Sequence, residues 1–274
     1  MRNIANFRGT AAVAVLCAAS MASGADSVHL SYSFVEPSAT VNEPVYLRVI
    51  LENGLDDDVT VDLGIDFHSR FHATLSRPDG RTDTVPERNR PVLLAGVPGR
   101  IHLEAHGRAE RRLLLNRWFS FDVPGRYFLD LELTGIPKTG SGIAAPLESR
   151  ADLVMDVCSR DPDRLSASCA RIERQALSAS DVGVGLEAAD ALGFTADPVA
   201  VPYIDRLMGE KPILESRLIN GLQRIADSTA VDVLISRLNS PSEDSRDLAR
   251  FALNVILIQT RDPQLSNRIK GALQ

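Results

Sequence analysis

The chain has 274 residues, of which 44% are hydrophobic and 24% charged, and its formal net charge is −6. These values are typical of globular proteins and exclude disordered and collagen-like chains. The acidic balance argues against a nucleic-acid partner, which requires a basic face, and against a polybasic membrane anchor. We therefore expect one or two globular domains that bind no nucleic acid.

Residues 1–25 have the pattern of a secretory signal peptide. Arg2 and Arg8 precede a short apolar stretch, which is too short to span a bilayer because a spanning helix takes about 20 residues. A lipoprotein signal at Cys17 is disfavoured because the bulky Leu16 stands where a small residue is expected. The sequence therefore predicts an exported protein, periplasmic or extracellular, without stable membrane insertion after the signal is removed.

Residues 26–157 alternate between apolar and polar positions, which is typical of strands with one buried face. The clearest alternating runs are 28–34, 45–51 and 127–133. Asn53-Gly54, followed by three aspartates at 56–58, predicts a hairpin turn, and Pro-Asp-Gly-Arg at 78–81 predicts another. This spacing predicts about eight or nine short strands in an antiparallel β-sandwich.

An aromatic cluster, a Pro-Gly turn and a strand that opens with Tyr127 lie within 116–131 (NRWFSFDVPGRYFLDL). Together with the strand entry at 42–45 (NEPV), this stretch resembles immunoglobulin-like sandwiches of the macroglobulin or fibronectin type. The resemblance implies that the Tyr127 hydroxyl bonds back to nearby backbone. We expect Trp118, the only tryptophan, to be a core residue rather than a ligand platform.

Residues 159–274 change to a helical period. A short apolar helix, a turn that contains Asp and a second helix recur about every 30 residues, as in an α-solenoid. The recurring pieces are ALGFTADPVAVPYIDRL, LQRIADSTAVDVLISRL and LNVILIQTRDPQLSNRI, and they resemble short bacterial HEAT-type repeats. The apolar run 255–258 suggests a buried terminal helix. The predicted fold is therefore an antiparallel β-sandwich followed by a short, HEAT-like α-solenoid.

Two cysteines, Cys158 and Cys169, remain once the signal is removed. An even pair in an oxidising compartment favours a disulfide, which would connect the last strand to the first helix and fix the angle between the domains. Two buried free thiols are the alternative. Two cysteines are too few for a structural zinc site.

The sequence contains no nucleophile elbow, phosphate loop or dinucleotide-binding motif. Two pairs of histidines are four residues apart, His68 with His72 and His102 with His106. On strands this spacing separates the Cα atoms by about 13 Å, which is too far for one metal ion. A cross-strand site of His72 and His102 stays open, as does calcium at 56–58, where we prefer a solvated turn. We expect no catalytic residue, no metal and no cofactor.

We predict a non-enzymatic binding or scaffolding protein that engages a protein partner through its helical repeats and sandwich loops. Four arginines near one side of successive helices are candidate contacts for an acidic partner, with a solvated face as the alternative: Arg217, Arg224, Arg246 and Arg250. One alternative function is a secreted peptidase inhibitor or regulator that uses the polar loop 81–91. Another is a cell-envelope carbohydrate-binding module, although the chain has few aromatic residues.

Overall fold

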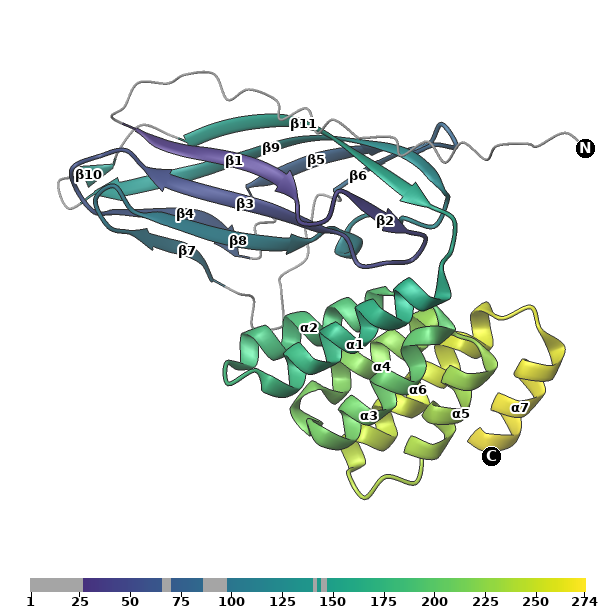
Figure 1. The fold of residues 1–274 in the computed structure, drawn as a ribbon. Coiled ribbons are helices and arrows are strands. Elements are labelled where there is room, and N and C mark those ends of the chain that lie inside the picture. Colours follow the sequence, from purple (N-terminus) through teal and green to yellow (C-terminus); the bar gives the residue numbers. More distant parts are fainter. Residues whose placement is uncertain (1–26, 66–69, 86–97, 140–141, 144–146) are drawn as a thin grey trace, which may run out of the picture.

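A computed structural model describes residues 27–65, 70–85, 98–139, 142–143 and 147–274. They form a β region of strands followed by a helical region of seven α-helices, with the two regions side by side (Figure 1). The fold is therefore mixed, with β first and α second, as the sequence predicts. The predicted signal peptide, 1–25, and His68 lie outside the described residues.

The β region contains two sheets. The smaller sheet has the antiparallel order β1 (Val28–Phe34), β3 (Tyr46–Asn53), β8 (Arg108–Leu114). The larger sheet has the order β2 (Ser38–Thr40), β11 (Leu147–Cys158), β9 (Gly125–Thr139), β4 (Val59–Ile65), β7 (Pro98–Leu103). Three further strands extend it: β5 (Phe71–Ser76) pairs with β9 and β6 (Thr82–Thr84), and β10 (Gly142–Ile143) pairs with β9. The β2 strand is parallel to β11, and the other described pairings are antiparallel.

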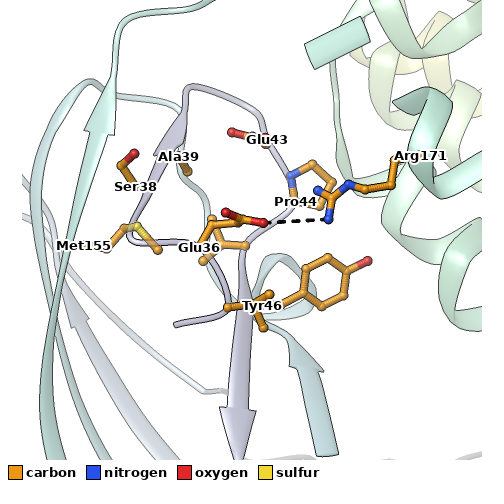
Figure 2. Close-up of a pocket in the computed structure, with 10 residues that line it drawn as sticks. Glu36, Ser38, Ala39, Glu43, Pro44, Tyr46, Met155 and Arg171 are labelled. Carbon is orange, nitrogen blue, oxygen red and sulfur yellow. Dashed lines mark ion pairs between the residues drawn. The ribbon is translucent and has the colours of Figure 1, made fainter. Parts of the chain in front are cut away.

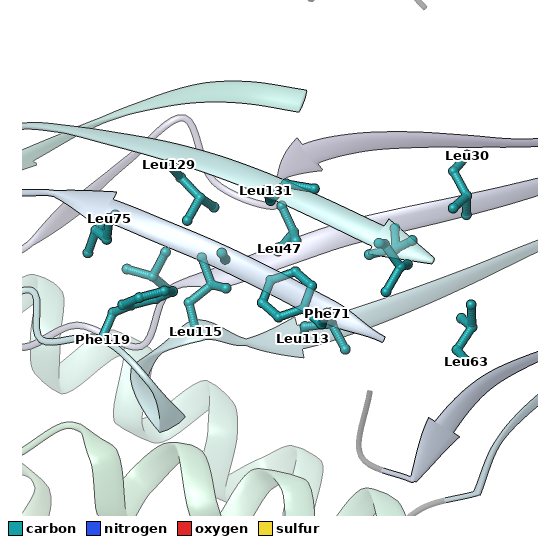
Figure 3. Close-up of a cluster of buried hydrophobic side chains, with 14 of the residues drawn as sticks. Leu30, Leu47, Leu63, Phe71, Leu75, Leu113, Leu115, Phe119, Leu129 and Leu131 are labelled. Atoms are coloured by element: carbon teal, nitrogen blue, oxygen red, sulfur yellow. The ribbon is translucent and has the colours of Figure 1, made fainter. Parts of the chain in front are cut away.

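Side chains from the two sheets fill one hydrophobic core (Figure 3). Leu47 of β3 in the smaller sheet and Leu131 of β9 in the larger sheet are both fully buried in it. Phe71 is also buried, and its ring centroid lies 5.1 Å from that of Trp118. Trp118 is partly buried and packs against this core, so the prediction of a core residue is confirmed in part.

Tyr127, at the start of β9, is fully buried. Its hydroxyl donates to the carbonyl oxygen of Val123 (2.8 Å) and accepts from the amide of the same residue (3.2 Å). A buried hydroxyl without partners would cost free energy, so these bonds allow the ring to enter the core. The predicted return of the hydroxyl to nearby backbone is confirmed.

Of the two predicted turns, the one at 78–81 is confirmed and the hairpin at Asn53-Gly54 is wrong. Residues 78–81 form the β5–β6 hairpin, where Gly80 adopts a φ of 81° that a side chain would disfavour. The turn after Asn53 is not a hairpin, because β3 belongs to the smaller sheet and β4 to the larger one. The Asn53 side chain donates to the carbonyl oxygens of Asp57 and Glu104, and these bonds hold the crossing between the sheets.

The helical region consists of α1 (Pro162–Ser178), α2 (Val182–Phe194), α3 (Val201–Glu210), α4 (Glu215–Ile225), α5 (Ser228–Arg237), α6 (Glu243–Gln259) and α7 (Pro263–Leu273). At the starts of four helices an aspartate side chain accepts hydrogen bonds from backbone amides of the first turn, which explains why aspartates recur in the turns. These residues are Asp161, Asp181, Asp227 and Asp262. Within the described ranges, no helix has both the length and the apolar character to cross a membrane.

The helices pack in two layers. The α2, α4 and α6 helices are neighbours in one layer, and α1, α3, α5 and α7 follow one another in the other (Figure 1). Ion pairs link successive helices of the second layer, Arg206 with Glu173 (2.9 Å), Arg237 with Asp205 (2.9 Å) and Arg268 with Asp232. Each helix pair is therefore joined to the next by an apolar contact in the core and a charged contact at the surface.

Candidate functional site

Two ion pairs with buried carboxylates join the helical region to the β region and the strand–helix connection. Arg160 donates from Nε and Nη2 to the two carboxylate oxygens of Asp197 (2.6 and 2.9 Å). Arg164 of α1 donates from Nε to Glu43 (2.7 Å) and from Nη2 to the carbonyl oxygen of Ser38 in β2. Charge-assisted bonds of this kind are stronger and more directional than neutral ones. They fix the start of α1 against β2.

The connection between β11 and α1 is held by a buried threonine of β2. The Thr40 hydroxyl donates to the carbonyl oxygen of Ser159 (2.6 Å) and accepts from the amide of Asp161 (2.9 Å). The amide of Val41 donates to the carbonyl oxygen of Cys158 (3.1 Å). Ser159 and Asp161 of this short connection are therefore bonded to the last residue of β2, and Cys158 to the residue that follows it.

The disulfide predicted between Cys158 and Cys169 is wrong, because both are free thiols in the structure. Cys158 is exposed at the end of β11, whereas Cys169 is fully buried in the core of the helical region. Burial raises the pKa of the Cys169 thiol to about 11, with a hydrogen bond to Thr195 acting in the opposite direction. Hydrogen bonds and ion pairs, rather than a covalent link, set the angle between the two regions.

A second contact between the regions centres on Asp190 of α2, which is nearly buried. Arg117, in the short helix η1 (Leu115–Arg117), donates to its carboxylate (2.8 Å), and Arg217 of α4 lies 3.4 Å from both carboxylate oxygens. One turn earlier, burial raises the pKa of Glu187, against the effect of Arg117 and Arg112. Two guanidinium groups therefore share one carboxylate, which leaves positive charge on this side of α4.

A further arginine of α4 lies along the same helix. Gly193 of α2 and Gly221 of α4 approach so closely that a Cβ on Gly221 would lie 2.5 Å from the Gly193 Cα. This contact brings the Arg224 guanidinium to 3.9 Å from the centroid of the Phe194 ring. Desolvation lowers the pKa of Arg224. Among the described residues, Arg224 has no carboxylate within ion-pair distance.

Apolar side chains form a stripe along α6. Its members follow one another at the three- and four-residue spacing of one helical face: Leu248, Phe251, Val255 and Ile258. Phe251 is 62% exposed and Ile258 is 83% exposed. The suggestion from 255–258 of a buried terminal helix is wrong, since only Ile256 of that run is buried and α7 follows.

The arginines of α4 and the stripe of α6 lie on neighbouring helices. Glu215 accepts a hydrogen bond from the hydroxyl of Ser245, so the two helices start side by side and run in the same direction. Neighbouring helices in contact are about 8–10 Å apart. The stripe therefore lies one helix away from the two arginines, whose contacts with Asp190 and Phe194 are on the α2 side of α4. We call this surface the α4–α6 face: Arg217, Asn220, Arg224, Leu248, Phe251, Val255 and Ile258.

The other two candidate arginines have local partners. Arg246 donates to the carbonyl oxygens of Ser240 (2.7 Å) and Pro241 (3.1 Å), in the loop before α6. Arg250 forms an exposed ion pair with Asp247 on its own helix (2.9 Å). Of the four candidates, the structure therefore brings Arg217 and Arg224 together. Phe251 was not among the residues predicted from the sequence, although the three- and four-residue spacing of the stripe is visible there.

A small pocket lies at the junction, between the segment around β2 and α1 (Figure 2). Val35, Pro44 and Met155 contribute apolar atoms, and Glu36 faces Arg171 across its rim at 3.9 Å. Its volume is about 300 Å³, which includes open solvent and is at the lower end of the range for ligand pockets. We regard it as a crevice between the two regions rather than a built ligand site.

The histidines that the structure describes do not come together in one site. His72 lies on β5 and His102 on β7, and these strands do not pair, so the cross-strand site left open by the sequence is not formed. His106 contacts Asp56 (3.1 Å) and His102 lies 3.8 Å from Asp58, as two separate exposed pairs. In the part of the chain that the structure describes, no group of three or more His, Cys, Asp and Glu could hold a metal ion.

Comparisons with known proteins show only distant likeness. No family model matches the chain, and no curated protein matches it. A PapD-like domain of human CEP192 is 16% identical, with 53% of this chain and 94% of that chain covered and a TM-score of 0.30. The putative ApaA protein from Bordetella pertussis is 13% identical over 48% and 92%, with a TM-score of 0.27. A protein named pT26-6p is 12% identical over 90% and 50%, with a TM-score of 0.29. Likeness at this level carries no argument about activity or partners.

Proposed function

We propose that the chain is an exported, non-enzymatic binding or scaffolding protein, and that its α4–α6 face docks a protein partner. The observation that carries this proposal is the apolar stripe of α6, exposed at Phe251 and Ile258, on the helix that packs against α4 and its two arginines. Leu248 and Val255 are partly buried beside these two side chains, and contiguous exposed apolar surface is typical of interaction sites.

The chemistry of the α4–α6 face specifies the partner surface. An apolar partner side chain over Phe251 would gain about 25 cal/mol for each Å² removed from water. Arg224 can pair with a carboxylate, because it has no acidic partner among the described residues. Arg217 shares Asp190 with Arg117, so it retains capacity for a second carboxylate. The surface therefore fits a partner that presents apolar and acidic side chains about one helix width apart.

We also infer that the helical region is a short HEAT-like solenoid and that the β region is immunoglobulin-like. Three successive helix pairs with an aspartate turn and two layers support the first assignment. Two packed sheets and the bonded hydroxyl of Tyr127 support the second. The two alternative functions have less support. The inhibitor loop 81–91 lies partly outside the described residues, and Trp118 is partly buried against the core.

Crosslinking of the exported protein in its own envelope tests the proposal. We expect Phe251→Asp to reduce capture of the partner about thirtyfold, because loss of a central anchor costs about 2 kcal/mol or more. Val182→Asp is the matched control, since Val182 is 52% exposed in the first turn of α2, outside the α4–α6 face. Equal capture by wild type and Phe251→Asp, with both variants folded, would contradict the proposal.

A further inference from the structure

The outer face of the larger sheet carries an apolar pair beside an acidic pair. Phe128 of β9 lies directly opposite Val154 of β11, and they are 53% and 50% exposed. One row further along the same face, Asp130 lies opposite Asp152, and both are exposed. Cβ atoms of opposite residues in an antiparallel pair are about 4.5–5.5 Å apart, so each pair forms one compact group.

The two aspartates differ from the other charged residues of that face. Arg126 pairs with Asp156 (3.0 Å), and Arg150 pairs with Glu132 (2.7 Å). Within the described residues, neither Asp130 nor Asp152 has a cation within ion-pair distance. Like charges placed directly opposite each other destabilise a sheet. A cation from outside the chain would relieve this repulsion.

The β9–β11 face, defined as Phe128, Asp130, Asp152 and Val154, complements the α4–α6 face. One surface has apolar side chains beside carboxylates, and the other has an apolar stripe on one helix and two guanidinium groups on the neighbouring helix. We propose that a second copy of this chain docks its β9–β11 face on the α4–α6 face of the first. This proposal rests on the proposed function, because it identifies the partner of the α4–α6 face.

The contact is head-to-tail. The two faces belong to different regions, and β9 and β11 are among the upper strands in Figure 1 whereas α4 and α6 lie below the β region. A docked pair therefore keeps one unused face of each kind, one at each end of the assembly. Such heterologous contacts build rings when the rotation closes, and open chains when it does not.

Sedimentation velocity of the exported chain tests this inference with two single-face variants. Phe251→Asp puts an acid in the stripe of α6, and Phe128→Arg puts a cation beside the acidic pair. We expect wild type to form concentration-dependent assemblies that high salt dissociates, and each variant alone to be monomeric. An equimolar mixture of the variants is expected to form dimers and nothing larger, because only one intact face remains on each copy.

Val182→Asp is the control and should assemble as wild type does. The inference is overturned if wild type is monomeric at every soluble concentration, or if the mixture of folded variants stays monomeric. If wild type is monomeric but Phe251→Asp still loses its partner in envelope crosslinking, the proposed function holds with a different protein as the partner. If Phe251→Asp affects neither assembly nor capture, both proposals fail.

Discussion

Asp197 shows how a buried charge is stabilised in this molecule. Only 2% of its side chain is exposed, whereas 45% of the Arg160 side chain remains accessible. Burial by itself would raise the pKa of Asp197, but hydrogen bonds from Arg160 and from the amide of Val199 outweigh it, so the pKa is lowered. The carboxylate is therefore stable only as long as its donors are present.

This asymmetry predicts unequal effects of removing either partner. Arg160→Ala leaves a buried, unpaired carboxylate and is expected to lower the free energy of unfolding by about 3 kcal/mol. Asp197→Asn removes the charge, keeps a good helix-start residue and leaves Arg160 free to reach water, so we expect a loss of about 1 kcal/mol. Urea denaturation of both variants measures the difference. Equal losses would contradict this account.

The same pair predicts a pH dependence. The lowered pKa of Asp197 means that its contribution to stability is complete above the unfolded-state value of about 3.9, and is lost as the pH falls through the folded-state value. The stability difference between wild type and Asp197→Asn should therefore be constant near neutral pH and shrink below about pH 4. If the stability difference grew on acidification instead, the pKa of Asp197 would be raised in the folded protein rather than lowered.

The two cysteines should differ in reactivity. In the chain without residues 1–25, we expect N-ethylmaleimide to label only Cys158 under native conditions, because Cys169 is buried and its thiol has a raised pKa. Labelling in denaturant should add a second label, and mass spectrometry counts both. If no label appears until a reductant is added, the cysteines form the disulfide that the structure lacks.

At the scale of elements, the contact between α2 and α4 depends on two glycines. Neither Gly193 nor Gly221 has a positive φ, so their role is close approach rather than backbone freedom. The approach also positions Phe194 beneath the guanidinium of Arg224. The spacing of the first layer of helices, and with it the position of the basic row, is therefore set by the absence of side chains at this crossing.

Gly221→Ala is expected to destabilise the protein by about 1–3 kcal/mol, because the new methyl group would overlap the α2 backbone. Gly209→Ala is the matched control in α3, where no atom lies within 4 Å of the new Cβ. That change should stabilise the helix by about 0.5–1 kcal/mol. Thermal unfolding of both variants tests the pair, and a stable Gly221→Ala would show that the helices can separate without cost.

Local patterns in the sequence predicted many of the strands and helices. Which sheet a strand joins, and which side chains are buried, depends on long-range packing that local patterns do not contain. Alternation identified β1 and β3, and recurring aspartates marked the helix starts, because both signals depend on neighbouring residues only. The sheet change after Asn53, the buried position of Cys169 and the exposure of Ile258 depend on which element packs alongside. For that reason the basic row on α4 was expected from spacing, while its apolar neighbour on α6 was missed.

At the scale of the whole molecule, the two regions share residues. Leu114, the last residue of β8, is buried in the helical core, and Tyr46 of β3 packs against that core. On the other side, Arg164 of α1 bonds Glu43, and Arg117 of the β region bonds Asp190 of α2. Interfaces with buried apolar and charged contacts of this kind oppose independent domain motion.

We therefore expect a single cooperative unfolding transition. Fluorescence of Trp118 reports on the β region and far-ultraviolet circular dichroism is dominated by the helices, so the two probes should give the same midpoint in urea. Combining Thr40→Val with Arg164→Ala removes bonds on both sides of the connection and should separate the midpoints. Arg250→Ala breaks an exposed ion pair and should change the free energy of unfolding by no more than about 0.5 kcal/mol, with the two midpoints still equal. Separate midpoints in wild type would contradict the shared junction.

Because of Thr40 in β2, the helical region begins at one point of the sequence but is anchored by residues of the β region far upstream. The helical region begins at Pro162, yet its first turn is anchored through Thr40 and Ser38, more than a hundred positions upstream. A helical fragment transplanted alone onto another protein would leave these anchors behind and expose the apolar surface that covers Leu114. The smallest fragment that can be transferred with this helical surface intact is therefore the β region and the helices together.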